Sequence, residues 1–291
     1  MPELLAAPLS RDVVDAIGPE TLAYLQGQMS QDLNALVDGQ STWSLLLEPQ
    51  GKITALLRVT RVSDEHFLLD TDAGFGEAVL ARLTRFKLRS KCELTLTTVA
   101  GVAWRGDGAA DIDTAGALIA ADAGWFGIQS LDVLGPDVVV PDGAATAETL
   151  ESLRIQSGWP AMGNEMDDST IPAAAGIVNV AASFTKGCYT GQELVARIDS
   201  RGNNTPKFLV KVLAMGEAVV GDEIVIEDAP VGVITSVVGR HGLAYVKRGT
   251  EVPVNVTVGA VQGRLMPIER DALPEPAAPQ GITSKVGFGR R

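Results

Sequence analysis

The segment from Phe184 to Arg197 reads FTKGCYTGQELVAR and holds Cys188, one of the two cysteines of the chain. Thr190 stands three residues before Glu193 and an apolar run follows, which is the pattern of a helix capping box with Thr190 as N-cap. Cys188 then lies near the positive end of the helix dipole, with Lys186 as a nearby cation. Both features favour a thiolate, so the pattern predicts a reactive thiol. The alternative is a small buried cysteine before an ordinary capped helix, and the residues alone leave both open.

Four segments together match a known family in their order along the chain. They are YLQGQ at Tyr24–Gln28, PQGKI at Pro49–Ile53, LRIQSGWP at Leu153–Pro160 and KGCYTGQE at Lys186–Glu193. They resemble the bacterial YgfZ folate-binding family, over roughly residues 15–265. That family is similar to the mitochondrial iron–sulfur assembly factor of the same type and, more distantly, to the T protein (aminomethyltransferase) of glycine cleavage. The octapeptide is the specific segment, and the other three are informative as an ordered set.

The resemblance implies an α+β fold of the T-protein type, with several subdomains around a central cavity and a small C-terminal β-barrel. The residues themselves indicate the barrel, because Ser200–Pro206 is a strong break and short Val/Ile-rich strands alternate with Gly turns from Lys207 to Ile268. We therefore expect a folate-binding region of two intertwined α+β subdomains at residues 1–204. The barrel is expected at 205–268 and a flexible tail at 269–291.

Apolar spacing and turn residues predict the elements of the N-terminal region. The predicted strands are Ser41–Glu48, Lys52–Val62, His66–Asp70 and Lys91–Thr98, with several short strands between Val99 and Val140, and the predicted helices are Thr21–Met29, Glu77–Phe86 and Ala144–Ser157. Cys92 falls on the apolar face of its strand, so we expect it in the core. From Gly158 to Ala182 the pattern predicts a long irregular stretch that covers the cysteine segment.

A short glycine pattern imitates a cofactor-binding motif. Gly74-Phe75-Gly76 follows a strand and opens a helix, like the start of a dinucleotide-binding fingerprint. Val79 replaces the third glycine and no parallel βαβ repeat surrounds the pattern, so we predict an ordinary helix N-terminus.

The resemblance also implies a function. It suggests a protein that binds tetrahydrofolate or a one-carbon derivative and assists iron–sulfur cluster assembly or repair, thereby supporting tRNA modification. Cys188 would be the reactive group, with Lys186 beside it, either as a transient thiolate ligand or as a nucleophile toward a one-carbon unit. The expected folate contacts are Gln28, Gln156, Tyr189, Gln192, Arg197 and Arg201. The expected partners are iron–sulfur client or assembly proteins.

Two other functions stay open at this point. One is a tetrahydrofolate-dependent aminomethyl or methyl transferase, and the other is a non-catalytic interaction scaffold. The chain departs from the T proteins after Ile53, where Ala55 and its neighbours supply no carboxylate, and from both relatives at Gln156, where they carry glutamate. An amide hydrogen-bonds a pterin edge but takes up no proton, so these departures count against the transferase.

Composition excludes several classes of protein. A formal net charge of -12 on 291 residues argues against stable nucleic acid binding and against an anionic membrane surface. Cys92 and Cys188 lie far apart without CxxC spacing, so we predict no metal site of zinc type, no self-contained cluster site and no disulfide framework. Residues 1–10 show no signal peptide and the apolar runs are too short to span a membrane, so we expect a cytoplasmic protein.

Overall fold

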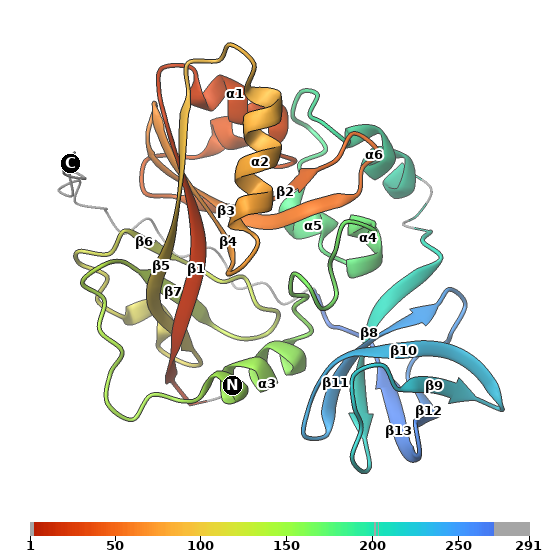
Figure 1. Cartoon of the computed structure of the whole chain (residues 1–291). Coiled ribbons are helices and arrows are strands. Elements are labelled where there is room, and N and C mark those ends of the chain that lie inside the picture. Colours follow the sequence, from red (N-terminus) through yellow and green to blue (C-terminus); the bar gives the residue numbers. More distant parts are fainter. Residues whose placement is uncertain (1–2, 201, 203, 271–291) are drawn as a thin grey trace.

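The structure is a computed structural model that describes residues 3–200, 202 and 204–270. A seven-stranded sheet with its covering helices forms the N-terminal part, and a closed six-stranded barrel forms the C-terminal part (Figure 1). The predicted α+β fold and C-terminal barrel are therefore confirmed. The tail predicted at 269–291 lies outside the described residues, apart from Glu269 and Arg270.

The sheet is antiparallel throughout, with strand order β2-β3-β4-β1-β5-β7-β6. The strands are β1 (Leu5–Ile17), β2 (Ser41–Leu47), β3 (Ile53–Ser63), β4 (His66–Asp72), β5 (Glu93–Arg105), β6 (Ile119–Ala121) and β7 (Ser130–Leu134). β1 is central because its 13 residues pair with β5 over their whole length and with β4 over the second half. The strand predicted at Lys91–Thr98 is thus the first part of the longer β5.

Two helices, α1 (Thr21–Gln28) and α2 (Gly76–Lys87), pack on one face of this sheet (Figure 1). Their apolar side chains join residues of β3 in one buried cluster, as the predicted spacing requires. Cys92 belongs to this cluster and is only 2% exposed, which confirms its predicted place in the core. Burial raises the pKa of its thiol. Two short 3-10 helices, η1 (Leu33–Ala35) and η2 (Ala109–Asp111), lie in connecting loops.

The start of α2 is occupied by a carboxylate from β1. Asp12 Oδ2 accepts hydrogen bonds from the backbone N–H of Gly74 at 2.8 Å and of Gly76 at 3.0 Å, and Oδ1 accepts one from the Thr98 hydroxyl at 2.8 Å. Burial raises the pKa of Asp12, but these bonds outweigh burial and hold the pKa below its usual value. The chain's own carboxylate therefore fills the place that a cofactor phosphate takes in a dinucleotide-binding fold.

Asp12→Ala is expected to lower the free energy of unfolding by about 1–2 kcal/mol at pH 7, because it removes the cap of α2. Since the folded-state pKa is lowered, the carboxylate contributes stability above an unfolded pKa of about 3.9, and this contribution is lost as pH falls through the folded pKa. Denaturant unfolding at pH 7 and at about pH 3 should show the parent–variant difference shrinking in acid. The exposed Asp107→Ala is the control. A difference independent of pH would contradict this role for Asp12.

The region after β7 is more regular than predicted. α3 (Ala147–Ser157) begins after Thr146, whose hydroxyl oxygen accepts from the backbone N–H of Thr149 at 3.2 Å, so the start predicted at Ala144 was three residues early. The prediction of an irregular stretch from Gly158 to Ala182 is wrong in part, because it contains α4 (Pro172–Ala175) and α5 (Val178–Ala181). Proline at the first position of α4 is the local reason for that turn of helix.

The barrel closes in the order β10-β11-β8-β13-β12-β9, and its interior is filled by valine, isoleucine, leucine and alanine side chains. Its strands are β8 (Lys207–Ala214), β9 (Glu223–Ile226), β10 (Ala229–Val238), β11 (His241–Lys247), β12 (Val254–Val258) and β13 (Val261–Met266). Closure pairs every strand on both sides and leaves no free sheet edge.

A buried carboxylate joins the barrel to the N-terminal part. Glu165 accepts hydrogen bonds from Arg154 of α3 at 2.9 Å and from the Ser236 hydroxyl of β10 at 2.6 Å. The Tyr245 hydroxyl of β11 donates to the Glu165 backbone carbonyl at 2.9 Å. The stretch after α3 thus packs between the two parts as a buried connector. Its helix α4 also contacts α6 (Gln192–Ser200) of the cysteine segment, as predicted, but Cys188 itself stays exposed.

Candidate functional site

The helix after the cysteine segment starts later than the capping box predicts. α6 runs from Gln192 to Ser200, and Gly191, with φ +84°, precedes it. A side chain at Gly191 would begin 2.7 Å from the Glu48 carbonyl oxygen, so only glycine fits there. The Glu193 carboxylate pairs with Arg197 instead of reaching back to the cap. The predicted capping box at Thr190 is therefore wrong, although the helix itself is present.

Lys186 anchors the cysteine segment to the end of α1. Its ammonium is buried and donates to the backbone carbonyls of Gln26 at 2.7 Å, Met29 at 2.7 Å and Gln31 at 2.9 Å. Burial lowers the pKa of Lys186 to about 8, against the attraction of Asp32. The three carbonyls occupy all three N–H groups of the charged form. They hold the exposed Cys188 on a fixed loop.

Three of the four segments that carry the family resemblance meet here. The backbone N–H of Thr190 donates to the Gly27 carbonyl of the first segment at 3.2 Å. In the second segment, Pro49–Ile53, a side chain at Gly51 would begin 2.5 Å from Leu194 Cβ and 3.1 Å from the Gly191 carbonyl oxygen. These close approaches explain physically why positions 51 and 191 are glycine, whereas a side chain at Gly27 would meet nothing within 4 Å.

The expected folate contacts do not gather around one space. Tyr189 is buried, and the centroid of its ring lies 5.3 Å from Lys186 Nζ. Burial raises the pKa of the Tyr189 hydroxyl to about 12. Gln28 accepts from Arg82 at 3.3 Å on the α2 side of α1, and Gln192 is the first residue of α6.

The remaining three expected contacts are Arg197, Gln156 and Arg201. Arg197 is exposed and paired with Glu193. Gln156 is on α3, where its amide donates to the Ser152 hydroxyl at 3.0 Å. Arg201 lies outside the described residues. Lys186 and Tyr189 thus lie near the end of α1, to which Gln28 belongs, whereas Gln156 belongs to another part of the fold.

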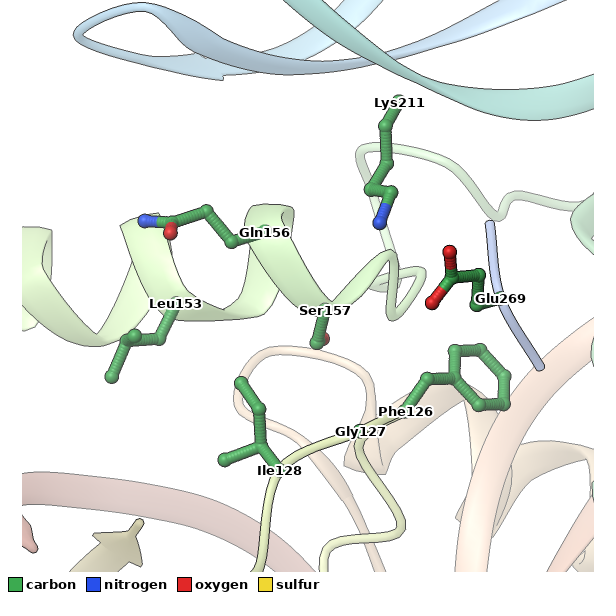
Figure 2. Close-up of a pocket in the computed structure, with 8 residues that line it drawn as sticks. All are labelled: Phe126, Gly127, Ile128, Leu153, Gln156, Ser157, Lys211 and Glu269. Atoms are coloured by element: carbon green, nitrogen blue, oxygen red, sulfur yellow. The ribbon is translucent and has the colours of Figure 1, made fainter. Parts of the chain in front are cut away.

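Gln156 lines a cavity of about 430 Å³, here called the junction cavity, between α3, the turn at residues 126–128 and the barrel. Figure 2 shows Lys211 of β8 and Glu269, from the segment after the barrel, directed toward each other across it. Phe126, Ile128 and Leu153 supply its apolar wall. None of the other expected contacts is among its lining residues.

A second cavity, of about 250 Å³, lies against the sheet beside α3. Three of the chain's four tryptophans line it, and three arginines and three carboxylates line it with them, so we call it the tryptophan–arginine cavity. These residues are Trp43, Trp125, Trp159, Arg11, Arg105, Arg154, Asp72, Asp132 and Glu151. Aromatic faces with a few fixed polar groups are typical of sites for flat heteroaromatic ligands.

A buried ion network holds the polar wall of this cavity in place. Arg58 is bidentate to Asp70, with both distances 3.0 Å, and also donates to Asp132 at 3.1 Å. Arg11 donates to Asp70 at 2.7 Å and Arg105 to Asp132 at 2.8 Å. Burial raises the pKa of Asp132, but its arginine partners outweigh burial and the net pKa is lowered. Asp132 therefore stays charged at neutral pH.

Two polar atoms of the lining residues have no hydrogen-bond partner within the described part of the chain: Trp43 Nε1 and Arg105 Nε. A buried N–H left unpaired costs about 1–3 kcal/mol, and such groups in native structures commonly serve a ligand, water or ion. Gly124, with φ +69°, borders this region, because a side chain there would begin 2.7 Å from Trp43 Nε1 and 3.3 Å from the Trp159 ring. The donors and aromatic faces fit the acceptor atoms and flat ring of a pterin.

Sequence reasoning missed this cavity, and one local signal pointed to it. Arg58 interrupts the apolar run at residues 55–59 of β3, and Asp70 directly follows the apolar run at residues 67–69 of β4. Charges in buried strands have to be paired, so they mark an ion network even without the fold. Their partners at Arg11 and Asp132 are not recognisable without the register of the sheet.

Comparison with known proteins places the chain among relatives. It is 29% identical over 243 residues to an uncharacterized protein of Haemophilus influenzae, covering 81% of this chain and 84% of that one. It is 32% identical over 212 residues to the tRNA-modifying protein YgfZ of Klebsiella pneumoniae and 30% identical over 218 residues to that of Photorhabdus laumondii. These alignments cover 64% and 66% of this chain, and 64% and 65% of the relatives, just under two thirds of their length.

The fold is also that of a solved protein. The glycine cleavage system aminomethyltransferase T of Bartonella henselae matches with a TM-score of 0.73 at 18% identity, over 92% of this chain and 88% of that one. At this identity the match shows the fold alone. Comparison with protein-family models gives no match. Among the described residues, no helix has the length and apolar character needed to span a membrane.

Proposed function

Because the chain belongs to the YgfZ family and has the T-protein fold, we propose that it binds tetrahydrofolate in the tryptophan–arginine cavity and supports iron–sulfur cluster assembly or repair. In this proposal tRNA modification depends on the protein through cluster-containing enzymes of the cytoplasm. The observation that carries the folate assignment is the cavity itself, whose lining includes three tryptophans. Two of its lining residues have a buried N–H without a hydrogen-bond partner among the residues that the structure describes.

The residues of the cavity have distinct parts in this proposal. The tryptophan faces bind the flat pterin ring, and Arg105 Nε and Trp43 Nε1 donate to its acceptor atoms. The buried ion network keeps Arg11 and Arg105 in position, since each guanidinium is held by an aspartate. When bound, the folate supplies a pterin ring for redox chemistry or a carrier for a one-carbon unit.

Cys188 has a separate part. It is exposed, whereas the residues of both cavities come from other segments, so we assign the thiol to a partner protein or its cluster. Of the two roles implied by the family, thiolate ligand and nucleophile toward a one-carbon unit, this position favours the ligand. The thiol gives its proton to water and the sulfur binds iron during transfer.

Aminomethyl transfer has the fold as its sole support. In the segment after Ile53, Ala55 is fully buried in the cluster beneath α1, where it can neither ionise nor face the cavity. Gln156 lines the junction cavity instead of the tryptophan–arginine cavity. These two positions therefore place no carboxylate beside a folate in the tryptophan–arginine cavity.

A fluorescence titration tests the folate assignment. Tetrahydrofolate is expected to quench tryptophan emission saturably, and Trp43→Phe is expected to weaken binding about tenfold, because about 1.4 kcal/mol of stacking and hydrogen bonding is lost. Trp104→Phe is the matched control, since the fourth tryptophan is not among the lining residues of the cavity. Absence of binding to the parent, or equal affinity in the two variants, would refute the assignment.

A further inference from the structure

The charged groups of the tryptophan–arginine cavity differ in exposure. Arg11 and Arg154 side chains are each 7% exposed, and Arg105 and Asp132 are more deeply buried. Asp72 is 37% exposed and Glu151 is 36% exposed. The charges that meet solvent at the rim of the cavity are therefore carboxylates.

Each cation of the lining already has carboxylate partners. Arg154 is bidentate to Glu151, at 2.7 and 2.8 Å, and also binds Glu165. Arg11 binds Asp70 and Asp72, and Arg105 binds Asp132. Three arginines thus face three lining carboxylates, so the lining carries no excess positive charge for an anionic tail.

Other features of the rim agree with this charge balance. Half-buried Leu9 and Leu150 contribute apolar surface beside the two carboxylates. The positive N-terminal end of α3 reaches the rim at Ala147, but Glu148 in the first turn of the helix already compensates that dipole. A volume of about 250 Å³ is below the range of about 300–1,000 Å³ that encloses a drug-sized ligand, so part of a folate must lie outside.

We propose that this site, if it binds folate as argued above, selects the pterin head with a short tail and discriminates against poly-γ-glutamate tails through Glu151 and Asp72. The apolar rim suits the aminobenzoyl ring that follows the pterin. Each further γ-glutamyl unit adds one carboxylate beside two rim carboxylates on a chain of net charge -12. Longer tails therefore gain no affinity. The repulsion between the tail carboxylates and the two rim carboxylates grows as the salt concentration is lowered.

The test compares three ligands on the full chain by fluorescence titration at low and high salt. They are tetrahydropteroate, which has no glutamate, monoglutamyl tetrahydrofolate and pentaglutamyl tetrahydrofolate. We expect the first two to have similar affinities and the pentaglutamate to bind no tighter than the monoglutamate. Glu151→Gln should lower the ratio of pentaglutamate Kd to monoglutamate Kd by about two- to fivefold at low salt and by less at high salt. Asp72→Asn should act in the same direction.

Glu217→Gln, an exposed carboxylate in the loop between β8 and β9, is the matched control and should leave the ratio unchanged. A pentaglutamate that binds tenfold tighter than the monoglutamate to the parent would overturn this inference and leave the proposed folate site standing. An unchanged ratio in both Glu151→Gln and Asp72→Asn would also overturn it. If none of the three ligands binds, the proposed function fails together with the inference.

Discussion

Cys188→Ser is expected to abolish support for iron–sulfur enzymes while the fold stays intact. The side chain is exposed and is fixed through the backbone and Lys186, so exchange of sulfur for oxygen disturbs no packing. A hydroxyl remains protonated at neutral pH and is a poor ligand for iron, so the proposed contact is lost. Cluster-enzyme activity and the level of modified tRNA in cells that carry only the variant measure the effect.

Thr185→Ala is the control for Cys188→Ser because it changes an exposed hydroxyl of the same segment. It should retain activity, and both variants should melt at the temperature of the parent. Full cluster-enzyme activity with serine at position 188 would disprove the role proposed for the thiol. The rate of thiol alkylation against pH, with and without tetrahydrofolate, gives a second readout. No effect of folate is expected, because Cys188 lines neither cavity.

Arg58→Met is expected to lower the free energy of unfolding by about 3–5 kcal/mol. Arg58 is 1% exposed and is the shared partner of Asp70 and Asp132, which are also buried. Methionine fills most of the volume but leaves Asp70 with Arg11 alone and Asp132 with Arg105 alone. The buried network then has one cation too few, and an uncompensated buried charge is strongly destabilising. A loss of this size is a large fraction of the stability of a typical domain, about 5–15 kcal/mol. Denaturant unfolding followed by circular dichroism measures it.

Arg61→Met provides the matched control on the same strand. Arg61 pairs with Asp38 and Asp64, which are largely exposed, so its loss should cost about 0–1 kcal/mol. Equal effects of the two substitutions would show that the network around Arg58 adds nothing beyond a surface ion pair. Folate affinity should fall in Arg58→Met alone, because that network positions Arg11 and Arg105 at the cavity.

The cysteine segment shows where local patterns misled. Thr190 and Glu193 have the spacing of a capping box, yet Gly191 stands before the helix because it touches the turn at residues 49–51. Lys186 has the position of an activating cation, yet its three N–H groups serve carbonyls near the end of α1. In both cases a tertiary contact with a segment more than a hundred residues away outweighed the local preference of the neighbouring residues.

Local pattern alone was enough for the elements whose physics is local. The period-2 alternation at the start of β5, the apolar stripe of α2, and the valine-rich repeats after Lys207 follow from side-chain periodicity, and so did the burial of Cys92. The fold class followed from these elements together with the family resemblance. The break before the barrel likewise follows from the turn residues between Ser200 and Pro206.

The cavity was decided only by tertiary structure. Arg11, Arg58 and Arg105 lie on three strands, and the register that sets Arg11 opposite Asp72 decides which carboxylate each guanidinium meets. Trp43, Trp125 and Trp159 come from separate segments, and only packing brings two of their rings to 5.2 Å. Ionic and aromatic contacts depend on distance in space, and distance along the chain says nothing about them until the sheet is assembled.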